Sequence, residues 1–220
     1  MKKYSIGTGS IILIFMFIGL VACDGTVDTR GISEEIQKRK IQRVTEADLM
    51  NLAQEKGQKI VDSSMRMIFK TLDSLTKAGN ISTAIPYCSE VRPQVKSIGD
   101  FYGAHYIRRT SLKIRNPENK PDSLEISLLD SYEFNKENNL ELSSNLQSLK
   151  KGSEILFTSP IIIPSGICLN CHGNPDKEIT PEVLAEIRKK YPEDKAVNYQ
   201  VGDLRGMWSI RFLRKDLLTR

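Results

Sequence analysis

Two thiols and an imidazole stand close together at Cys168-Leu169-Asn170-Cys171-His172. Residues at i, i+3 and i+4 lie on one side of a helical turn, so the two sulfur atoms and the ring face the same way. In a Cys-x-x-Cys-His motif the two thiols add to the two vinyl groups of a haem, and the histidine offers a nitrogen to the iron. The spacing therefore predicts one covalently attached haem c, with Cys168 and Cys171 as attachment points and His172 as an axial iron ligand.

Three other chemistries use similar residues. A thioredoxin-like dithiol would need a βαβ context, which the preceding Pro164–Gly166 does not provide. Cys88, Cys168, Cys171 and His172 could instead form a Cys₃His zinc site, and Cys168 and Cys171 could form a disulfide. Export of the chain, argued below, favours haem attachment over sites that need reduced thiolates.

The chain has four cysteines, and Cys88 is left over once Cys23 is assigned to lipid and the motif pair to haem. A leftover thiol in an exported protein suggests intermolecular pairing, a reactive thiol or a protected one. Binding to iron would protect Cys88, whereas the simpler alternative is a small buried hydrophobe. The other candidates for the sixth iron position are His105, Met50, Met65, Met67 and Met207.

The first residues have the layout of a bacterial lipoprotein signal. Met1–Lys3 is positively charged, residues 11–18 are apolar but too short to span a membrane comfortably, and Leu20-Val21-Ala22-Cys23 resembles a lipobox. We therefore expect residues 1–22 to be removed and Cys23 to be lipidated. The protein would then be anchored on the periplasmic side of a bacterial membrane, inner or outer. An ordinary signal peptide or an uncleaved anchor is the alternative.

Charge argues against nucleic acid as a partner. The formal net charge is +5, of which Lys2 and Lys3 supply two, and no basic stripe with interleaved aromatic residues is present. The expected partners are the membrane, through the lipid anchor, and a redox or signalling protein.

Helices dominate the first half of the expected domain, which covers residues 45–220. Residues 23–44 precede it as a polar tether and a charged spacer, helical over residues 33–44. A capping signal at Thr45 and Asp48 predicts a long helix over residues 46–77. A second helix, over residues 82–98, carries Cys88 and should be bent or shortened by its prolines.

Strands are expected later in the chain. Residues 107–115 alternate in polarity, which predicts a strand with Arg109, Lys113 and Arg115 on one face. These three side chains are either candidate contacts for haem propionates or a solvated face. Further strands are predicted over residues 155–163 and 206–213, with helices over residues 121–134 and from Pro181 to Tyr191. The order indicates an α+β fold in which helices pack on an antiparallel sheet.

Four stretches of this sequence resemble a family of haem-c-binding, PAS-like domains that was long catalogued as a domain of unknown function. They are Ala84–Cys88, Arg109–Pro117 with Asn119 and Pro121, Cys168–Gly173, and Gly202–Ser209. The resemblance implies a PAS-like sheet with flanking helices and one haem. It also implies that the iron is held by the motif histidine and by a cysteine of an early helix, which match His172 and Cys88. Pro86, just before Cys88, departs from the family pattern.

Three functions fit these expectations to different degrees. A redox or gas sensor fits the PAS-like resemblance, but no output segment follows the domain, so signalling would need a separate partner. A membrane-tethered electron carrier fits a single haem and a lipid anchor. A haem enzyme such as a peroxidase is disfavoured, because two protein ligands would leave no open iron position. The sequence does not separate electron transfer from sensing.

Overall fold

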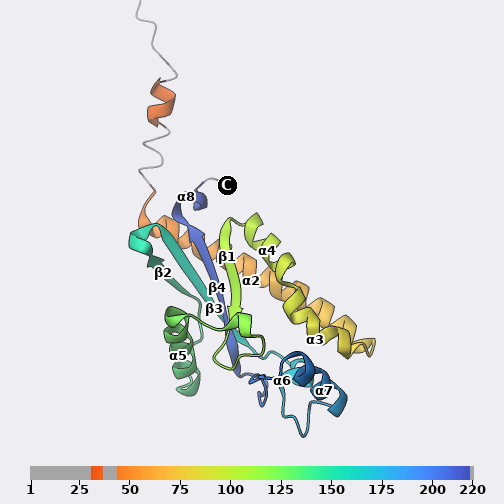
Figure 1. Ribbon diagram of the computed structural model, residues 1–220. Coiled ribbons are helices and arrows are strands. Elements are labelled where there is room, and N and C mark those ends of the chain that lie inside the picture. Colours follow the sequence, from red (N-terminus) through yellow and green to blue (C-terminus); the bar gives the residue numbers. More distant parts are fainter. Residues whose placement is uncertain (1–30, 37–43, 219–220) are drawn as a thin grey trace, which may run out of the picture. The chain divides into compact units, whose positions relative to one another are not determined.

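The computed structural model describes residues 31–36 and 44–218, and a compact unit begins at Val44. Four antiparallel strands form its sheet in the order β1-β4-β3-β2. Their bounds are β1 Ala104–Thr110, β2 Asn145–Leu149, β3 Glu154–Ile162 and β4 Leu204–Leu213. Helices α2, α3 and α4 lie along one face, and α5 covers the other (Figure 1). This α+β arrangement confirms the predicted fold class and is consistent with a PAS-like sheet.

Helix α2 spans Glu46–Lys77, the same bounds that the sequence predicts. It begins with a capping box in which Thr45 and Asp48 each accept a hydrogen bond from the other's backbone N–H. Gly57 lets this helix lie directly on β3, because a Cβ atom there would come within 2.5 Å of the Phe157 ring. The contact places the helix across the sheet and over the main apolar core, which includes Trp208 and Phe212.

The predicted helix over residues 82–98 is instead two helices, α3 Ile81–Glu90 and α4 Arg92–Phe101. Pro86 lies inside α3, and Pro93 lies in the first turn of α4, where its missing N–H costs least. The break at Val91 lets α3 follow α2 while α4 packs on β1. Cys88 therefore lies near the end of α3.

The predicted strand over residues 107–115 is wrong beyond Thr110, where β1 ends. Thr110 pairs with Met207 of β4, and its hydroxyl then donates to the carbonyl of Asn119 at 2.8 Å. From Ser111 the chain bends, and the Ser111 hydroxyl donates to the Lys113 carbonyl at 3.2 Å. Arg109, Lys113 and Arg115 consequently do not share one strand face, because only Arg109 belongs to the strand.

The other predicted elements agree with the structure apart from their ends, whereas β2 and several short helices were not predicted. Helix α5 spans Ser123–Glu137, α7 spans Pro181–Lys190, and short helices are η1 Pro117–Asn119, η2 Lys150–Gly152, η3 Gly166–Cys168, α6 Leu169–His172 and α8 Arg214–Leu217. A separate helix covers residues 31–36 and overlaps only the first residues of the spacer helix predicted over residues 33–44. The predicted signal peptide and Cys23 lie outside the described residues. Among those described, no helix is long and apolar enough to cross a membrane.

Candidate functional site

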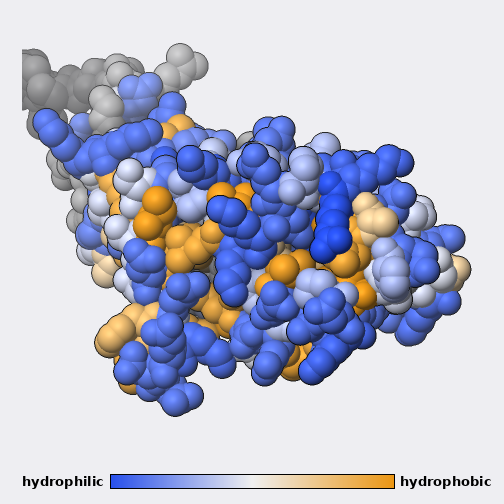
Figure 2. Space-filling model, turned by 60° about the horizontal axis from the view of Figure 1, so that its bottom comes forward, coloured by the Kyte–Doolittle hydropathy of each residue, from blue (hydrophilic) through white to orange (hydrophobic). Residues whose placement is uncertain are grey.

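A cavity lies where α2, α3, the end of β1, the start of β4 and the segment η3–α6 meet. The cavity is partly open, and the space between atoms within it, counted together with the adjoining solvent, is about 1370 Å³. Apolar side chains form much of its wall; they are Met65, Ile68, Phe69, Leu72, Ile85, Ile114, Ile161, Ile162 and Ile167. In a view from the side of α6 and α7, hydrophobic residues lie in hollows between hydrophilic ones (Figure 2). The cavity is thus an apolar chamber with an opening.

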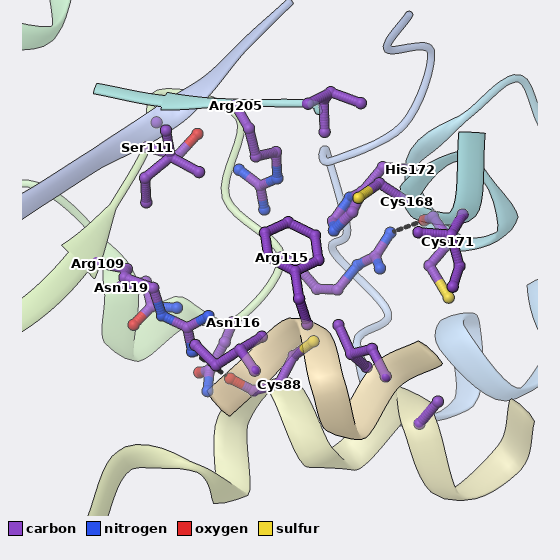
Figure 3. Close-up of a pocket in the computed structure, with 18 of the residues that line it drawn as sticks. Cys88, Arg109, Ser111, Arg115, Asn116, Asn119, Cys168, Cys171, His172 and Arg205 are labelled. Carbon is purple, nitrogen blue, oxygen red and sulfur yellow. Dashed lines mark hydrogen bonds between the residues drawn. The ribbon is translucent and has the colours of Figure 1, made fainter. Parts of the chain in front are cut away.

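The Cys-x-x-Cys-His motif forms one wall of this chamber (Figure 3). Cys168 closes the 3-10 turn η3, and the following single turn α6 holds Cys171 and His172. Burial raises the pKa of Cys171 to about 11 and also raises the pKa of Cys168. Both sulfurs are therefore held as thiols when no metal is bound.

His172 is held in one orientation by its backbone surroundings. Its Nδ1 lies 2.8 Å from the carbonyl oxygen of Ala196. A carbonyl can only accept, so Nδ1 donates and Nε2 keeps a free lone pair. Burial lowers the pKa of His172 well below its ordinary value, and the positive charges of Arg205 and Arg115 lower it further. The residue is a neutral imidazole, the form that binds a metal.

Cys88 enters the same cavity from α3, on another side from His172 (Figure 3). It is half-buried, and it and the motif cysteines are free thiols. Of the other proposed sixth ligands, only Met65 lines the cavity. His105 lies at the far end of β1, where its Nε2 is 2.7 Å from Glu154 Oε1. The cavity therefore brings together His172, Cys88 and Met65, and leaves His105 outside.

The four residues of the zinc alternative do not form an assembled metal site in the part of the chain that the structure describes. Within the described ranges, no three histidine, cysteine, aspartate or glutamate side chains come close enough together to hold a metal ion. The four residues Cys88, Cys168, Cys171 and His172 line one cavity, but they do not converge on a point of metal size.

The three predicted basic residues have three different surroundings. Arg109 lines the cavity, donates to the carbonyl of Cys88, and stacks over the Trp208 ring at 5.6 Å. Arg115 also lines it, with Nη2 donating to Asp194 at 2.9 Å and to the carbonyl of Cys171 at 2.6 Å. Lys113 is exposed outside the cavity wall. Arg109 thus forms a hydrogen bond to the helix that carries Cys88, and Arg115 forms one to the Cys-x-x-Cys-His segment.

Arg205 is a cavity residue that sequence reasoning missed. It lies at the start of β4 and extends into the cavity toward Arg115 and His172 (Figure 3). The sequence offered one signal for this residue. Arg205 directly precedes the segment Gly206–Phe212, which is too apolar to be a strand that faces solvent, so a basic side chain at its start is unexpected. Burial lowers the pKa of Arg205, and the charges of Arg115 and Arg109 act in the same direction.

Gly206 explains how β4 comes so close to the end of β1. A Cβ atom at this position would lie 2.3 Å from the carbonyl oxygen of Thr110, closer than any real contact. Residue 206 must be glycine for the backbones of β4 and β1 to come this close. The close approach places the neighbouring Arg205 at the cavity.

The family model described as "Tll0287-like: Tll0287" matches residues 37–212. A solved structure, described as the crystal structure of the cyanobacterial heme-protein Tll0287, is 26% identical in sequence. The match covers 69% of this chain and 93% of the other, with a TM-score of 0.47. No curated protein matches.

Proposed function

The chain belongs to the Tll0287-like family, and on this premise we propose that it carries one covalently attached haem c in the cavity described above. The observation that supports this proposal most is the meeting of the motif's two thiols, the neutral His172 and Cys88 in one apolar chamber. The motif alone is a pattern of sequence, whereas the cavity adds space for a flat apolar ring beside the residues that would attach it.

The residues of the cavity fit a haem in three respects. The wall is largely apolar, as a porphyrin ring requires. The two thiols and the imidazole stand in one segment, η3–α6. Guanidinium groups of Arg109 and Arg205 also line the cavity, and guanidinium pairs well with carboxylates such as the haem propionates.

Each chain residue has a distinct role in this proposal. Cys168 and Cys171 each form a thioether when the sulfur bonds to one carbon of a vinyl group and the thiol hydrogen goes to the other carbon, with no net oxidation. His172 binds iron through Nε2, since Nδ1 is engaged by the Ala196 carbonyl. Cys88 binds iron from α3. A haem held in this way supplies a reversible one-electron couple.

A haem-stained denaturing gel of protein matured in a host with c-type attachment machinery tests this function. We expect one haem per chain that survives extraction with acid and organic solvent, and no stain in the Cys168→Ala, Cys171→Ala double variant. Zinc bound in stoichiometric amount to the matured wild-type protein, with no haem, would contradict the proposal and support the zinc-binding alternative.

We also propose that the protein is exported and lipid-anchored at Cys23 on the periplasmic side of a bacterial membrane. The support is the lipobox-like Leu20–Cys23 behind a short apolar segment. The Cys23→Ala variant should move from the membrane fraction to the soluble fraction. Equal fractionation of variant and wild type, or a mature N-terminus elsewhere, would overturn the anchor.

The redox role divides into electron transfer and redox or gas sensing, with a separate protein as the partner in both cases. An electron carrier keeps both protein ligands on the iron in the ferric and ferrous states, whereas a gas sensor releases one of them. The reaction of the reduced protein with CO separates the two roles. Rapid CO binding indicates sensing through a displaced ligand, and no binding indicates electron transfer.

A further inference from the structure

The cavity wall carries more positive charge than its own chain compensates. Three guanidinium groups line it, from Arg109, Arg115 and Arg205, and no aspartate or glutamate of the described residues lies in that wall. A buried charge is stable only when it is paired and hydrogen-bonded, because removing it from water is costly. The ion-pair partners of the three arginines therefore show which of them lacks a negatively charged group.

Arg115 is compensated from within the chain. Its Nη2 forms an ion pair with Asp194 at 2.9 Å, and the same nitrogen donates to the carbonyls of Cys171 and Ala196 at 2.6 and 3.1 Å. Asp194 is itself almost completely buried beside it. This pair is a structural element that holds the haem motif in place.

Arg205 has no such partner. Its Nη1 donates to the Lys113 carbonyl at 3.1 Å, and its guanidinium lies 5.5 Å from the centre of the Tyr199 ring. Its Nε, like the Nε of Arg115, is buried without a hydrogen-bond acceptor. Unlike Arg115, it forms no ion pair with a carboxylate of the described chain, and Asp194 acts on its charge only at longer range. The side chain is thus oriented by a carbonyl and an aromatic ring while part of its hydrogen-bonding capacity stays unused.

Arg109 resembles Arg205 in this respect. It donates to the carbonyl of Cys88 and lies over Trp208, and among the described residues no carboxylate pairs with it. The cavity therefore presents two half-buried cations, from the end of β1 and the start of β4, that have no ion pair among the described residues.

We propose that Arg205, together with Arg109, binds the carboxylate groups of the cofactor, so that Arg205 is a cofactor-binding residue and Arg115 is a structural one. This inference rests on the proposed function and assigns its anionic subsite. The haem carries two propionates, which supply the two missing negative charges. Planar guanidinium groups that are already oriented lose little freedom when they form such pairs.

Metal-free protoporphyrin IX and its dimethyl ester are suitable probes, because the ester lacks the carboxylate charges. Binding to the full mature chain made without haem attachment can be followed by quenching of Trp208, the one tryptophan of the sequence. Arg205→Gln should weaken binding of the diacid at least about tenfold. It should leave binding of the ester unchanged, and Arg205→Lys should retain much of the diacid affinity.

Arg188→Gln is the matched control, because Arg188 is exposed on α7 and should change neither affinity. Equal weakening of diacid and ester by Arg205→Gln, or no weakening of either, would overturn the assignment. The haem-stained gel tests the proposed function separately, since thioethers rather than Arg205 would retain the haem. In the matured protein, Arg205→Gln should keep the stain and lower the reduction potential, because a positive charge beside ferric iron is lost.

Discussion

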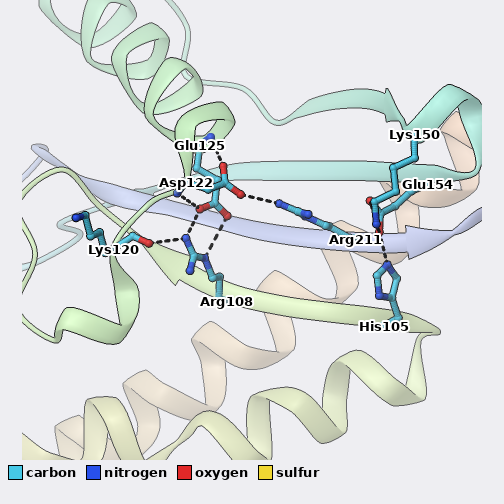
Figure 4. A network of polar contacts seen from close by, with 8 residues as sticks. All are labelled: His105, Arg108, Lys120, Asp122, Glu125, Lys150, Glu154 and Arg211. Carbon is cyan, nitrogen blue, oxygen red and sulfur yellow. Dashed lines mark hydrogen bonds and ion pairs between the residues drawn. The ribbon is translucent and has the colours of Figure 1, made fainter.

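Arg108 and Arg109 are neighbours in β1, yet they face opposite sides of the sheet and meet opposite surroundings. Arg108 points toward α5, where its Nε donates to Glu125 Oε1 at 3.1 Å and its Nη2 to the Lys120 carbonyl at 2.7 Å (Figure 4). Arg109 points into the cavity, where it meets a carbonyl and a tryptophan ring but no carboxylate of the described chain.

The α5 side as a whole is compensated. Glu125, fully buried, pairs with Arg108, and Asp122 accepts from Arg211 at 2.9 Å. At the other end of the sheet His105 and Lys150 flank the buried Glu154 (Figure 4). Positive charge on this side is paired within the chain, whereas Arg109 and Arg205 of the cavity wall have no ion pair among the described residues. Substitutions on the two sides should therefore act on different quantities.

The largest effect on stability is expected from Glu125→Gln. Removing one partner of a buried ion pair leaves the Arg108 charge uncompensated and should lower the free energy of unfolding by about 3 kcal/mol. Urea denaturation followed by Trp208 fluorescence measures it. Glu118→Gln is the control, because the pair of Glu118 with Arg92 is exposed and should contribute no more than about 1 kcal/mol. Equal effects of both substitutions would remove the contrast between buried and exposed pairs.

Gly206→Ala should have an intermediate effect. The added Cβ would meet the Thr110 carbonyl at 2.3 Å, so the ends of β1 and β4 must separate. Overpacking of this kind costs about 1–3 kcal/mol. Thermal or urea unfolding measures the loss, and Gly166→Ala, where no atom lies within 4 Å of the new Cβ, should be close to neutral. A Gly206→Ala protein as stable as wild type would show that the close approach is not required.

The smallest effect on stability is expected from Arg205→Gln in protein without haem. The substitution removes a half-buried charge without an ion pair and one hydrogen bond to a carbonyl. The free energy of unfolding should therefore rise or stay within about 1 kcal/mol of the wild-type value. The same urea titration measures it. A loss as large as that of Glu125→Gln would mean that Arg205 is structural and that the two sides of the sheet do not differ.

Local signals in the sequence predicted the elements whose causes are local. The capping pair Thr45 and Asp48 predicted the start of α2, and Pro181 predicted the start of α7. The alternation of polar and apolar residues beyond Thr110 wrongly predicted that the strand continues. The pairing of β1 with β4 ends at Thr110, and the chain turns there because of tertiary contacts. β2 was missed because this edge strand is five residues long and mostly half-exposed, without a clear apolar face.

The four residues that the sequence predicts for the site line one cavity, but the sequence did not predict what surrounds them. The spacing of Cys168, Cys171 and His172 is visible in the sequence, and the place of Cys88 followed from the resemblance. The compensation of Arg115 by Asp194, and its absence at Arg205, depend on contacts between residues 79 and more positions apart. Such pairings have no local signature, so the sequence grouped Arg109, Lys113 and Arg115 and missed Arg205.

The central claim is that the cavity holds a haem whose iron is bound by His172 and Cys88. Electron paramagnetic resonance of the matured ferric protein tests it most directly, with Met65→Leu as control because Met65 is the other sulfur donor of the cavity wall outside the motif. We predict a low-spin thiolate signal that is lost in Cys88→Ala, with a rise in reduction potential because a negative ligand no longer stabilises ferric iron, and that is kept in Met65→Leu. An unchanged signal in Cys88→Ala would contradict the claim.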